Sequence, residues 1–302
     1  MTALSHIDEL DGTSPPYWLT SYYTPEGALR QKRYLLTRRH HPRTTPILDA
    51  IGACASDEGQ CLRNLTEVIE ADPSLDAQVV QTRAPERGGA AEVAGEIKVY
   101  FRFHPKIRSD ARRAASRLAF AVSRVDDGTG TRAAAGLLRD RILEAYTAWP
   151  LLYVSVALRP GLEVEVYYDL IRDGRQLDKT HTLSLLKRFG AGVGALDTAA
   201  AVWDTCTDVL SMPDNIAIDF HGGHDISLYA PWPETCPMDR TELTRVFTRI
   251  AAVGTRSGPV PDARIPQGPG FVPTLVPIKI TPDGQALPAL EEIDPVRVGD
   301  IY

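Results

Sequence analysis

Residues 95–105, with the sequence GEIKVYFRFHP, alternate between polar or aromatic side chains and apolar ones. Successive side chains of a β-strand point to opposite faces of the sheet, so Lys98, Tyr100 and Arg102 share one face. The opposite face is apolar and consists of Val99, Phe101 and Phe103. A strand of this kind needs an apolar layer on one side and water or a polar ligand on the other. The fold must therefore place this strand between an apolar core and a polar space.

The core of this strand recurs twice further along the chain. Lys98-Val-Tyr100 is followed by Glu165-Val-Tyr167 and then by Ser227-Leu-Tyr229, and each copy comes a few residues after a glycine. Self-similarity at a similar spacing indicates repeated structural units. The intervals leave room for about four helices and strands in each unit.

Apolar periodicity predicts the order helix, strand, strand, helix, repeated three times over residues 46–253. The expected helices cover residues 46–70, 109–125, 132–147, 179–189, 198–210 and 240–253, with a glycine-rich link at 190–194. The expected strands cover residues 76–83, 96–104, 151–159, 162–172, 215–221, 225–230 and 274–281. Residues 1–45 are predicted to be an irregular N-terminal arm with one strand at 31–40, and residues 254–302 a loop, a final strand and an acidic tail. Together, residues 1–302 are predicted to form a single domain.

Strands joined by short turns run antiparallel, and about eight to ten of them exceed what a strongly twisted open sheet usually carries. Closure into a barrel would remove the exposed edges. The predicted fold class is therefore α+β, an antiparallel β-barrel built from repeated αββα units with the helices outside. The inward faces would line a tyrosine-rich lumen that holds water or a charged ligand, because an unpaired buried charge costs several kcal/mol. The alternative is an open sheet with helices on one face and water on the other.

Charge and composition exclude several classes of protein. The formal charge of −6 at pH 7 argues against a nucleic-acid-binding protein, which needs a basic surface. No apolar run approaches the roughly 18–20 residues of a membrane span, and the polar first residues are unlike a signal peptide, so we expect the cytoplasm. The cysteines contain no C-x-x-C pair, which favours buried free thiols over a zinc or redox site. They are Cys54, Cys61, Cys206 and Cys236.

Alternating lysine, arginine and tyrosine on strands suits a diphosphate ligand. Cations form charge-assisted hydrogen bonds with phosphate oxygens, and phenol rings stabilise a nearby cation through their π faces. On Lys98-Val-Tyr100, and on the repeated strands that reach Tyr167 and Tyr229, the chain resembles the aromatic prenyltransferases of the αββα barrel type over roughly residues 47–281. Residues 215–234, NIAIDFHGGHDISLYAPWPE, are also similar to a hairpin of the cyanobactin peptide prenyltransferase branch.

The resemblance implies transfer of an isoprenyl group from an allylic diphosphate to an aromatic or peptide side-chain acceptor, in the biosynthesis of a secondary metabolite or peptide natural product. It implies that Lys98, Tyr100 and Arg102 bind the diphosphate. It also implies that Tyr167 and Tyr229 shield the allyl cation. The expected partners are an isoprenyl diphosphate and an aromatic small molecule or peptide, without nucleic acid or membrane. The enzyme would be a monomer that requires no cofactor, Mg2+ being the one candidate.

The resemblance also implies a catalytic base, and this chain departs from the family pattern at two positions. The family places an acidic residue on the first strand of the first repeat, where this chain has Asp76, and Glu165 is the rival candidate. A carboxylate beside a cationic site stays ionised and can accept a proton. Where the family often repeats Lys-x-Tyr, this chain has Glu165 and Ser227, so two expected cations are missing. Arg159 and Lys279 are the candidates to replace them in diphosphate binding.

Two other functions compete with prenyl transfer. In the segment DFHGGHD, Asp219, His221 and His224 could offer oxygen and nitrogen ligands to a metal, which would indicate a metal-dependent hydrolase or lyase. A tight hairpin turn explains the two glycines of this segment without a metal. The third alternative is a non-catalytic barrel that binds a small molecule or a peptide, because a polar lumen indicates a ligand and not a reaction.

Overall fold

A computed structural model describes the segments that carry most of the barrel. These are residues 18–23, 29–34, 75–83, 96–103, 113, 151–157, 164–172, 175–219, 225–233, 240–254 and 272–293.

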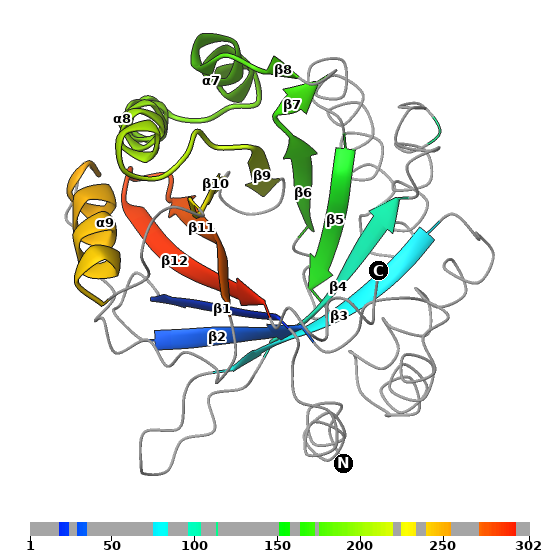
Figure 1. Ribbon diagram of the computed structural model, residues 1–302. Helices are drawn as coiled ribbons and strands as arrows, with labels where there is room; N and C mark the ends of the chain where they lie inside the picture. The colour runs from blue at the N-terminus through cyan, green and yellow to red at the C-terminus, as the bar shows by residue number, and fades with distance from the viewer. Residues whose placement is uncertain are drawn as a thin grey trace.

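In these described segments, ten strands pair antiparallel, each with two neighbours, and close into a barrel (Figure 1). Around the barrel their order is β1-β12-β11-β10-β9-β6-β5-β4-β3-β2. In chain order they are β1 (Trp18–Tyr23), β2 (Leu29–Tyr34), β3 (Leu75–Arg83), β4 (Glu96–Phe103), β5 (Leu151–Ala157), β6 (Val164–Asp169), β9 (Asn215–Asp219), β10 (Ile226–Pro231), β11 (Val272–Ile280) and β12 (Ala286–Ile293). A separate small ribbon consists of β7 (Ile171–Arg172) and β8 (Arg175–Gln176).

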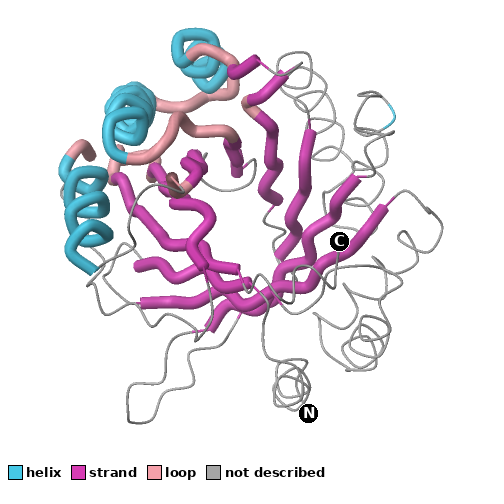
Figure 2. The backbone as a smooth tube through the Cα atoms, in the orientation of Figure 1, coloured by secondary structure: helices cyan, strands magenta, loops and turns pink. Residues whose placement is uncertain are grey.

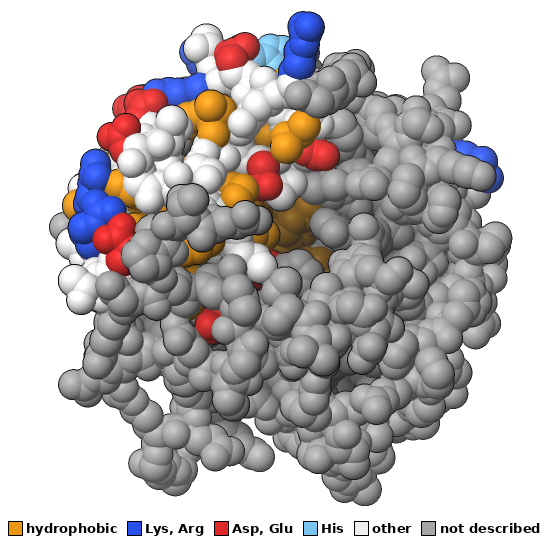
Figure 3. Space-filling view, viewed as in Figure 1, with side chains coloured by type: hydrophobic (Ala, Val, Ile, Leu, Met, Phe, Trp, Pro, Cys, Tyr) orange, Lys and Arg blue, Asp and Glu red, His pale blue; other side chains and the backbone are white. Residues whose placement is uncertain are grey.

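Three described helices lie outside the ring of strands, as Figure 2 shows: α7 (Lys179–Arg188), α8 (Val193–Val209) and α9 (Arg240–Ala252). The first helix begins at Asp178, whose carboxylate accepts a hydrogen bond of 2.8 Å from the backbone N–H of His181. Helix α8 packs on β10 and β11, and α9 packs on β12. Helix α9 buries residues three or four positions apart, namely Leu243, Val246, Phe247 and Ile250. Basic and acidic side chains lie interspersed over the outer surface of the three helices (Figure 3).

The two-residue period of the strands separates an outer apolar layer from an inner polar one. On β6, Val166 and Tyr168 are fully buried beneath the outer layer, whereas Glu165 and Tyr167 lie on the inner face. On β10, buried residues alternate with half-buried ones: Ile226, Leu228 and Ala230 are buried, and the residues between them are half-buried. In the described segments, the strand pairing leaves the main sheet without an open edge, and helices pack on the outer side of β10, β11 and β12.

Most of the predicted elements that fall on described residues are confirmed. Strands expected at 76–83, 96–104, 151–159, 162–172, 215–221, 225–230 and 274–281 correspond to β3, β4, β5, β6, β9, β10 and β11. Helices expected at 179–189, 198–210 and 240–253 correspond to α7, α8 and α9, although α8 begins earlier, at Val193, inside the predicted link. The helices expected at 46–70, 109–125 and 132–147 lie outside the described residues except for Arg113. The αββα repetition of the first two units therefore stays a prediction.

Two predictions about the ends of the barrel are wrong. Residues 18–23, expected to be irregular, form β1, and residues 286–293, expected to be an acidic tail, form β12. These strands pair with each other and close the barrel. Both faces of β12 are buried, with Leu290 and Glu292 at 0% exposure and Glu291 at 4%. Its sequence therefore lacks the polar and apolar alternation by which a half-buried strand is recognised.

Two further expectations concern membranes and thiols. Within the described segments, no helix combines the length and the apolar character needed to cross a membrane. Cys206 is a buried free thiol, as predicted, and burial raises its pKa to about 12. The other three cysteines, Cys54, Cys61 and Cys236, lie outside the described residues.

Candidate functional site

Three tyrosines from the three repeated strands meet inside the barrel. The hydroxyl oxygens of Tyr100 on β4 and Tyr167 on β6 lie 3.2 Å apart, and their ring centroids are separated by 5.6 Å. The ring of Tyr229 on β10 lies 5.9 Å from that of Tyr167. Tyr100 and Tyr167 are buried and Tyr229 is half-buried. The tilted rings present both π faces and hydroxyl groups to the lumen.

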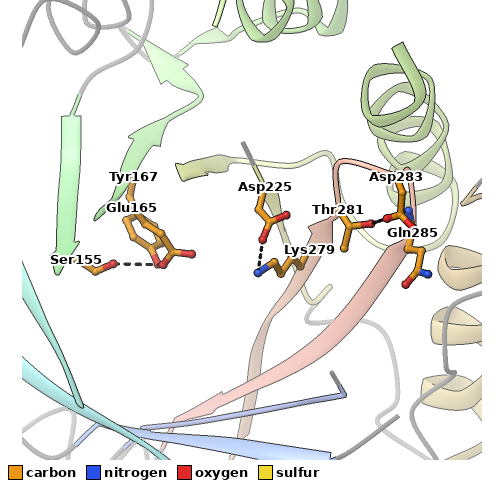
Figure 4. Close-up of polar contacts among 8 residues, drawn as sticks. All are labelled: Ser155, Glu165, Tyr167, Asp225, Lys279, Thr281, Asp283 and Gln285. Atoms are coloured by element: carbon orange, nitrogen blue, oxygen red, sulfur yellow. Dashed lines mark hydrogen bonds and ion pairs between the residues drawn. The ribbon is translucent and has the colours of Figure 1, made fainter. Parts of the chain in front are cut away.

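Glu165 fixes the direction of hydrogen bonding in this cluster (Figure 4). Its Oε2 atom accepts hydrogen bonds from the Tyr167 hydroxyl at 2.8 Å and from Ser155 Oγ at 3.2 Å. A phenol has a single proton, so Tyr167, which donates to Glu165, must accept from Tyr100. The result is a directed chain from Tyr100 through Tyr167 to the carboxylate. Glu165 is 9% exposed, so this chain is largely shielded from water.

The electrostatic environment keeps Tyr229 neutral. Burial raises the pKa of Tyr229 well above its ordinary value, and the negative charges of Glu165 and Glu291 and the neighbouring Tyr100 raise it further. A hydrogen bond with Tyr167 acts in the opposite direction but is outweighed. Neutral phenol rings close to two carboxylates create a region that favours a positively charged guest. This is the chemical property that the stabilisation of an allyl cation requires.

Two of the predicted diphosphate-binding residues occupy described backbone positions on β4. Lys98 and Arg102 lie two positions to either side of Tyr100 and share its face of the sheet. The register sets Arg102 opposite Asp76 on β3 and opposite Tyr153 on β5. The predicted acid and a predicted cation are therefore direct neighbours in the backbone ladder. The side chains of Lys98, Arg102 and Asp76 lie outside the described part of the structure, so their roles stay predictions.

Lys279 occupies the barrel wall at the level of the third repeated motif. On β11 it lies directly opposite Ser227 on β10, at the position where a motif lysine is absent. Figure 4 shows Lys279 turned toward Asp225, and its Nζ atom lies 2.5 Å from the Asp225 carboxylate. The lysine is 44% exposed, so its ammonium group remains accessible to a ligand. Arg159, the other replacement cation, lies outside the described residues.

Two further residues line the lumen, and neither was among the residues predicted from the sequence. Glu291 on β12 is 4% exposed and raises the pKa of Tyr229 by its charge. Thr20 on β1 lies opposite Glu291 in the register and is 5% exposed. The only sequence signal for Glu291 was an acidic pair, Glu291-Glu292, in a segment without alternation. Both residues sit on the two strands whose existence was not predicted.

The metal-site alternative rests on residues that the structure leaves largely undescribed. The strand position of Asp219 is described, opposite Glu165 on β6, but His221 and His224 lie outside the described residues. Among the described residues, no group of three or more histidine, cysteine, aspartate or glutamate side chains could hold a metal ion. The metal-site alternative therefore stays a prediction.

Comparison with known proteins gives a match at the level of structure. No family model matches the sequence, and no curated protein matches it. Among solved structures, 5-dimethylallyltryptophan synthase from Streptomyces coelicolor matches with a TM-score of 0.54 at 11% identity, covering 92% of this chain and 81% of that one. The chain has the fold of the aromatic prenyltransferases.

Two more prenyltransferase-fold structures give the same result. The prenyltransferase PriB in a ternary complex with L-tryptophan and dimethylallyl thiolodiphosphate matches with a TM-score of 0.53 at 14% identity, over 92% of this chain and 79% of that one. The 6-dimethylallyltryptophan synthase from Micromonospora olivasterospora, in complex with DMASPP and Trp, matches with a TM-score of 0.51 at 14% identity, over 92% and 82%. The resemblance predicted from the repeated tyrosine strands is confirmed for the prenyltransferase fold.

Proposed function

We propose that this protein is a prenyltransferase that moves an isoprenyl group from an allylic diphosphate to an aromatic or peptide side-chain acceptor. The observation that carries the proposal is the cluster of Tyr100, Tyr167 and Tyr229, held by Glu165 inside a barrel of the prenyltransferase fold. Tyrosine π faces beside buried carboxylates suit an allyl cation, because both the rings and the carboxylates attract positive charge. The structural neighbours named above bind a dimethylallyl diphosphate analogue together with tryptophan, which supports the same chemistry here.

The proposed reaction assigns one role to each group of residues. Lys98, Arg102 and Lys279 would hold the diphosphate and neutralise its charge as the bond between C1 and the oxygen breaks. The tyrosine cluster would surround the allyl cation and exclude water, which would otherwise capture it. A carbon or heteroatom of the acceptor then bonds to C1, the acceptor loses a proton and diphosphate leaves. No electron donor or acceptor is needed, because both electrons of the new bond come from the acceptor.

Glu165 and Asp76 can be assigned different parts in this reaction. Glu165 already accepts hydrogen bonds from Tyr167 and Ser155, so its carboxylate is suited to positioning the rings and to supplying negative potential. Asp76, next to Arg102 in the register, is then the preferred base for the acceptor's proton. The proposal also includes a single domain with three αββα units, catalysis without an obligatory metal, and a hairpin of the cyanobactin peptide prenyltransferase type at 215–234.

Mass spectrometry tests the proposal directly. The full chain is incubated with dimethylallyl, geranyl or farnesyl diphosphate and with tryptophan, tyrosine or short aromatic peptides, with and without Mg2+. We expect an acceptor that gains one isoprenyl group, and we expect Tyr167→Phe to slow this reaction by breaking the chain to Glu165. Tyr168→Phe is the matched control, since Tyr168 is the next residue and lies on the outer face of β6. Diphosphate binding without product from any acceptor would instead favour the non-catalytic barrel.

A further inference from the structure

The wall formed by β1 and β12 carries a polar pair that the proposed reaction does not use. Thr20 on β1 and Glu291 on β12 are direct partners in the antiparallel ladder. Side chains at such positions lie on the same face, with Cβ atoms about 4.5–5.5 Å apart. Thr20 is 5% exposed and Glu291 is 4% exposed. The pair is therefore a buried polar patch on the wall of the barrel.

This pair faces the lumen and lies close to the tyrosine cluster. The charge of Glu291 acts on the hydroxyl of Tyr229, which belongs to that cluster. The next residue, Glu292, lies on the opposite face of β12, the side on which α9 packs. Alternation along the strand thus separates two adjacent glutamates, one inside the barrel and one outside.

The hydroxyl of Thr20 indicates that a ligand group belongs beside Glu291. Its Oγ1 atom is buried and has no hydrogen-bond partner among the described residues. Buried polar groups in native proteins are nearly always hydrogen-bonded, and an exception calls for a partner such as a ligand or a water. A carboxylate can only accept hydrogen bonds, and a threonine hydroxyl can accept as well as donate. A group with N–H donors and a positive charge can donate to the Thr20 hydroxyl and is attracted by the charge of the Glu291 carboxylate.

We propose that Glu291 and Thr20 form a subsite for a protonated amine of the acceptor, held across the lumen from the reacting ring. The inference rests on the proposed prenyl transfer, since it assigns the site's acceptor to the class of aromatic amines. The ammonium donates to the Glu291 carboxylate and to Thr20 Oγ1, while the ring of the acceptor lies against the tyrosine cluster. Glu165, the other carboxylate that acts on Tyr229, lies on β6 and favours the positive charge of the same guest.

Calorimetric binding to the full chain tests this subsite with two probes of similar size. Tryptamine carries an ammonium group, and tryptophol carries a neutral hydroxyl in its place. A charge-assisted hydrogen bond predicts that the wild type binds tryptamine at least about tenfold more tightly than tryptophol. Glu291→Gln should bring the affinity for tryptamine down to that for tryptophol and leave tryptophol unchanged. Glu292→Gln, one residue away on the outer face, is the matched control and should preserve the preference.

The second variant keeps the test decisive if Glu291→Gln does not fold. Thr20→Val keeps the shape of the side chain and should reduce tryptamine affinity several-fold without affecting tryptophol. Equal affinities of the wild type for the two probes would overturn the inference, as would an equal loss for both probes in Glu291→Gln. Either result would mean that Glu291 only balances the charge of a cation of the barrel wall. Lys32 is such a cation, because it lies on β2 directly opposite Thr20.

The two proposals fail in different ways. Prenylated product that forms equally from tryptamine and tryptophol would overturn the amine subsite alone. Selective binding of tryptamine, without product from any isoprenyl diphosphate, would support the subsite and overturn the prenyltransferase reaction. Binding of neither probe at millimolar concentration would overturn the subsite.

Discussion

Glu292 should make the stability of this protein fall as the pH rises toward neutrality. It lies on the outer face of β12 with 0% exposure, and neither carboxylate oxygen has a hydrogen-bond partner among the described residues. Removal from water penalises the charged form, so the pKa of Glu292 is raised from 4.5 to about 7. The folded protein therefore holds this proton over a pH range in which the unfolded chain releases it.

The size and sign of the effect follow from linkage. Each unit of pKa difference between the folded and unfolded states corresponds to about 1.36 kcal/mol, so Glu292 accounts for about 3 kcal/mol. Well below pH 4.5 both states are protonated and the group has no effect on the free energy of unfolding. Between pH 4.5 and about 7 the free energy of unfolding falls, because only the unfolded state loses its proton, and above about 7 the loss is complete.

Urea unfolding at a series of pH values measures this effect. Glu292→Gln cannot ionise, so its free energy of unfolding, relative to the wild type, should increase by about 3 kcal/mol between pH 4.5 and 7.5. The difference between the two proteins is the quantity to follow, because burial and the charge of Asp169 also raise the pKa of Asp214, to about 6, and both proteins share that effect.

A surface variant serves as the control for the loss of a carboxylate. Asp208→Asn removes a side chain that is 68% exposed and that lies 3.6 Å from Arg249, so we expect a change below about 1 kcal/mol. If the wild type and Glu292→Gln keep a constant difference across the whole pH range, the assignment of Glu292 as a buried neutral acid is refuted.

Three further predictions concern single residues. Lys98→Ala should weaken the binding of an isoprenyl diphosphate by about 1.5–3 kcal/mol, as titration calorimetry can measure, and an unchanged affinity would remove Lys98 from the diphosphate site. Cys206 should not react with a thiol reagent at pH 8 while the protein is folded, because burial raises its pKa to about 12. This is read by absorbance in a variant whose other three cysteines are serine, and rapid labelling of the native state would contradict it. Asp178→Ala should destabilise the protein by about 0.5–2 kcal/mol, because α7 loses the cap on the His181 N–H, whereas Asp178→Asn should retain most of the stability. Equal urea midpoints for the two variants would contradict the capping role.

The sequence predicted the strands that have one apolar and one polar face. In β4, β6 and β10 the alternation is clear, and the repeated Tyr100, Tyr167 and Tyr229 do converge in the structure. The hydrogen bond from Tyr167 to Glu165 was not predicted, because it depends on the rotamers of two side chains on the same strand. The sequence had instead offered Glu165 as a possible base.

The parts that the sequence did not predict depend on contacts between distant segments. β12 is buried on both faces, so its composition gives no period, and β1 was too short and polar to distinguish from an irregular arm. The position of Lys279 opposite Ser227 follows from the pairing of β10 with β11, and a long stretch of chain separates these two strands. No local pattern contains that information, since register between distant strands is set by the whole barrel.

The pairing of β1 with β12 has a consequence for the order in which the protein folds. These two strands come from opposite ends of the described chain, yet they are adjacent in the barrel. During synthesis β1 must therefore wait until β12 has left the ribosome, with one of its edges exposed in the meantime. An exposed strand edge can pair with another chain, and contacts of long sequence separation form slowly. The yield of folded protein should thus depend on how soon β12 is synthesised after β1. A chain whose synthesis stops before residue 286 should aggregate rather than fold.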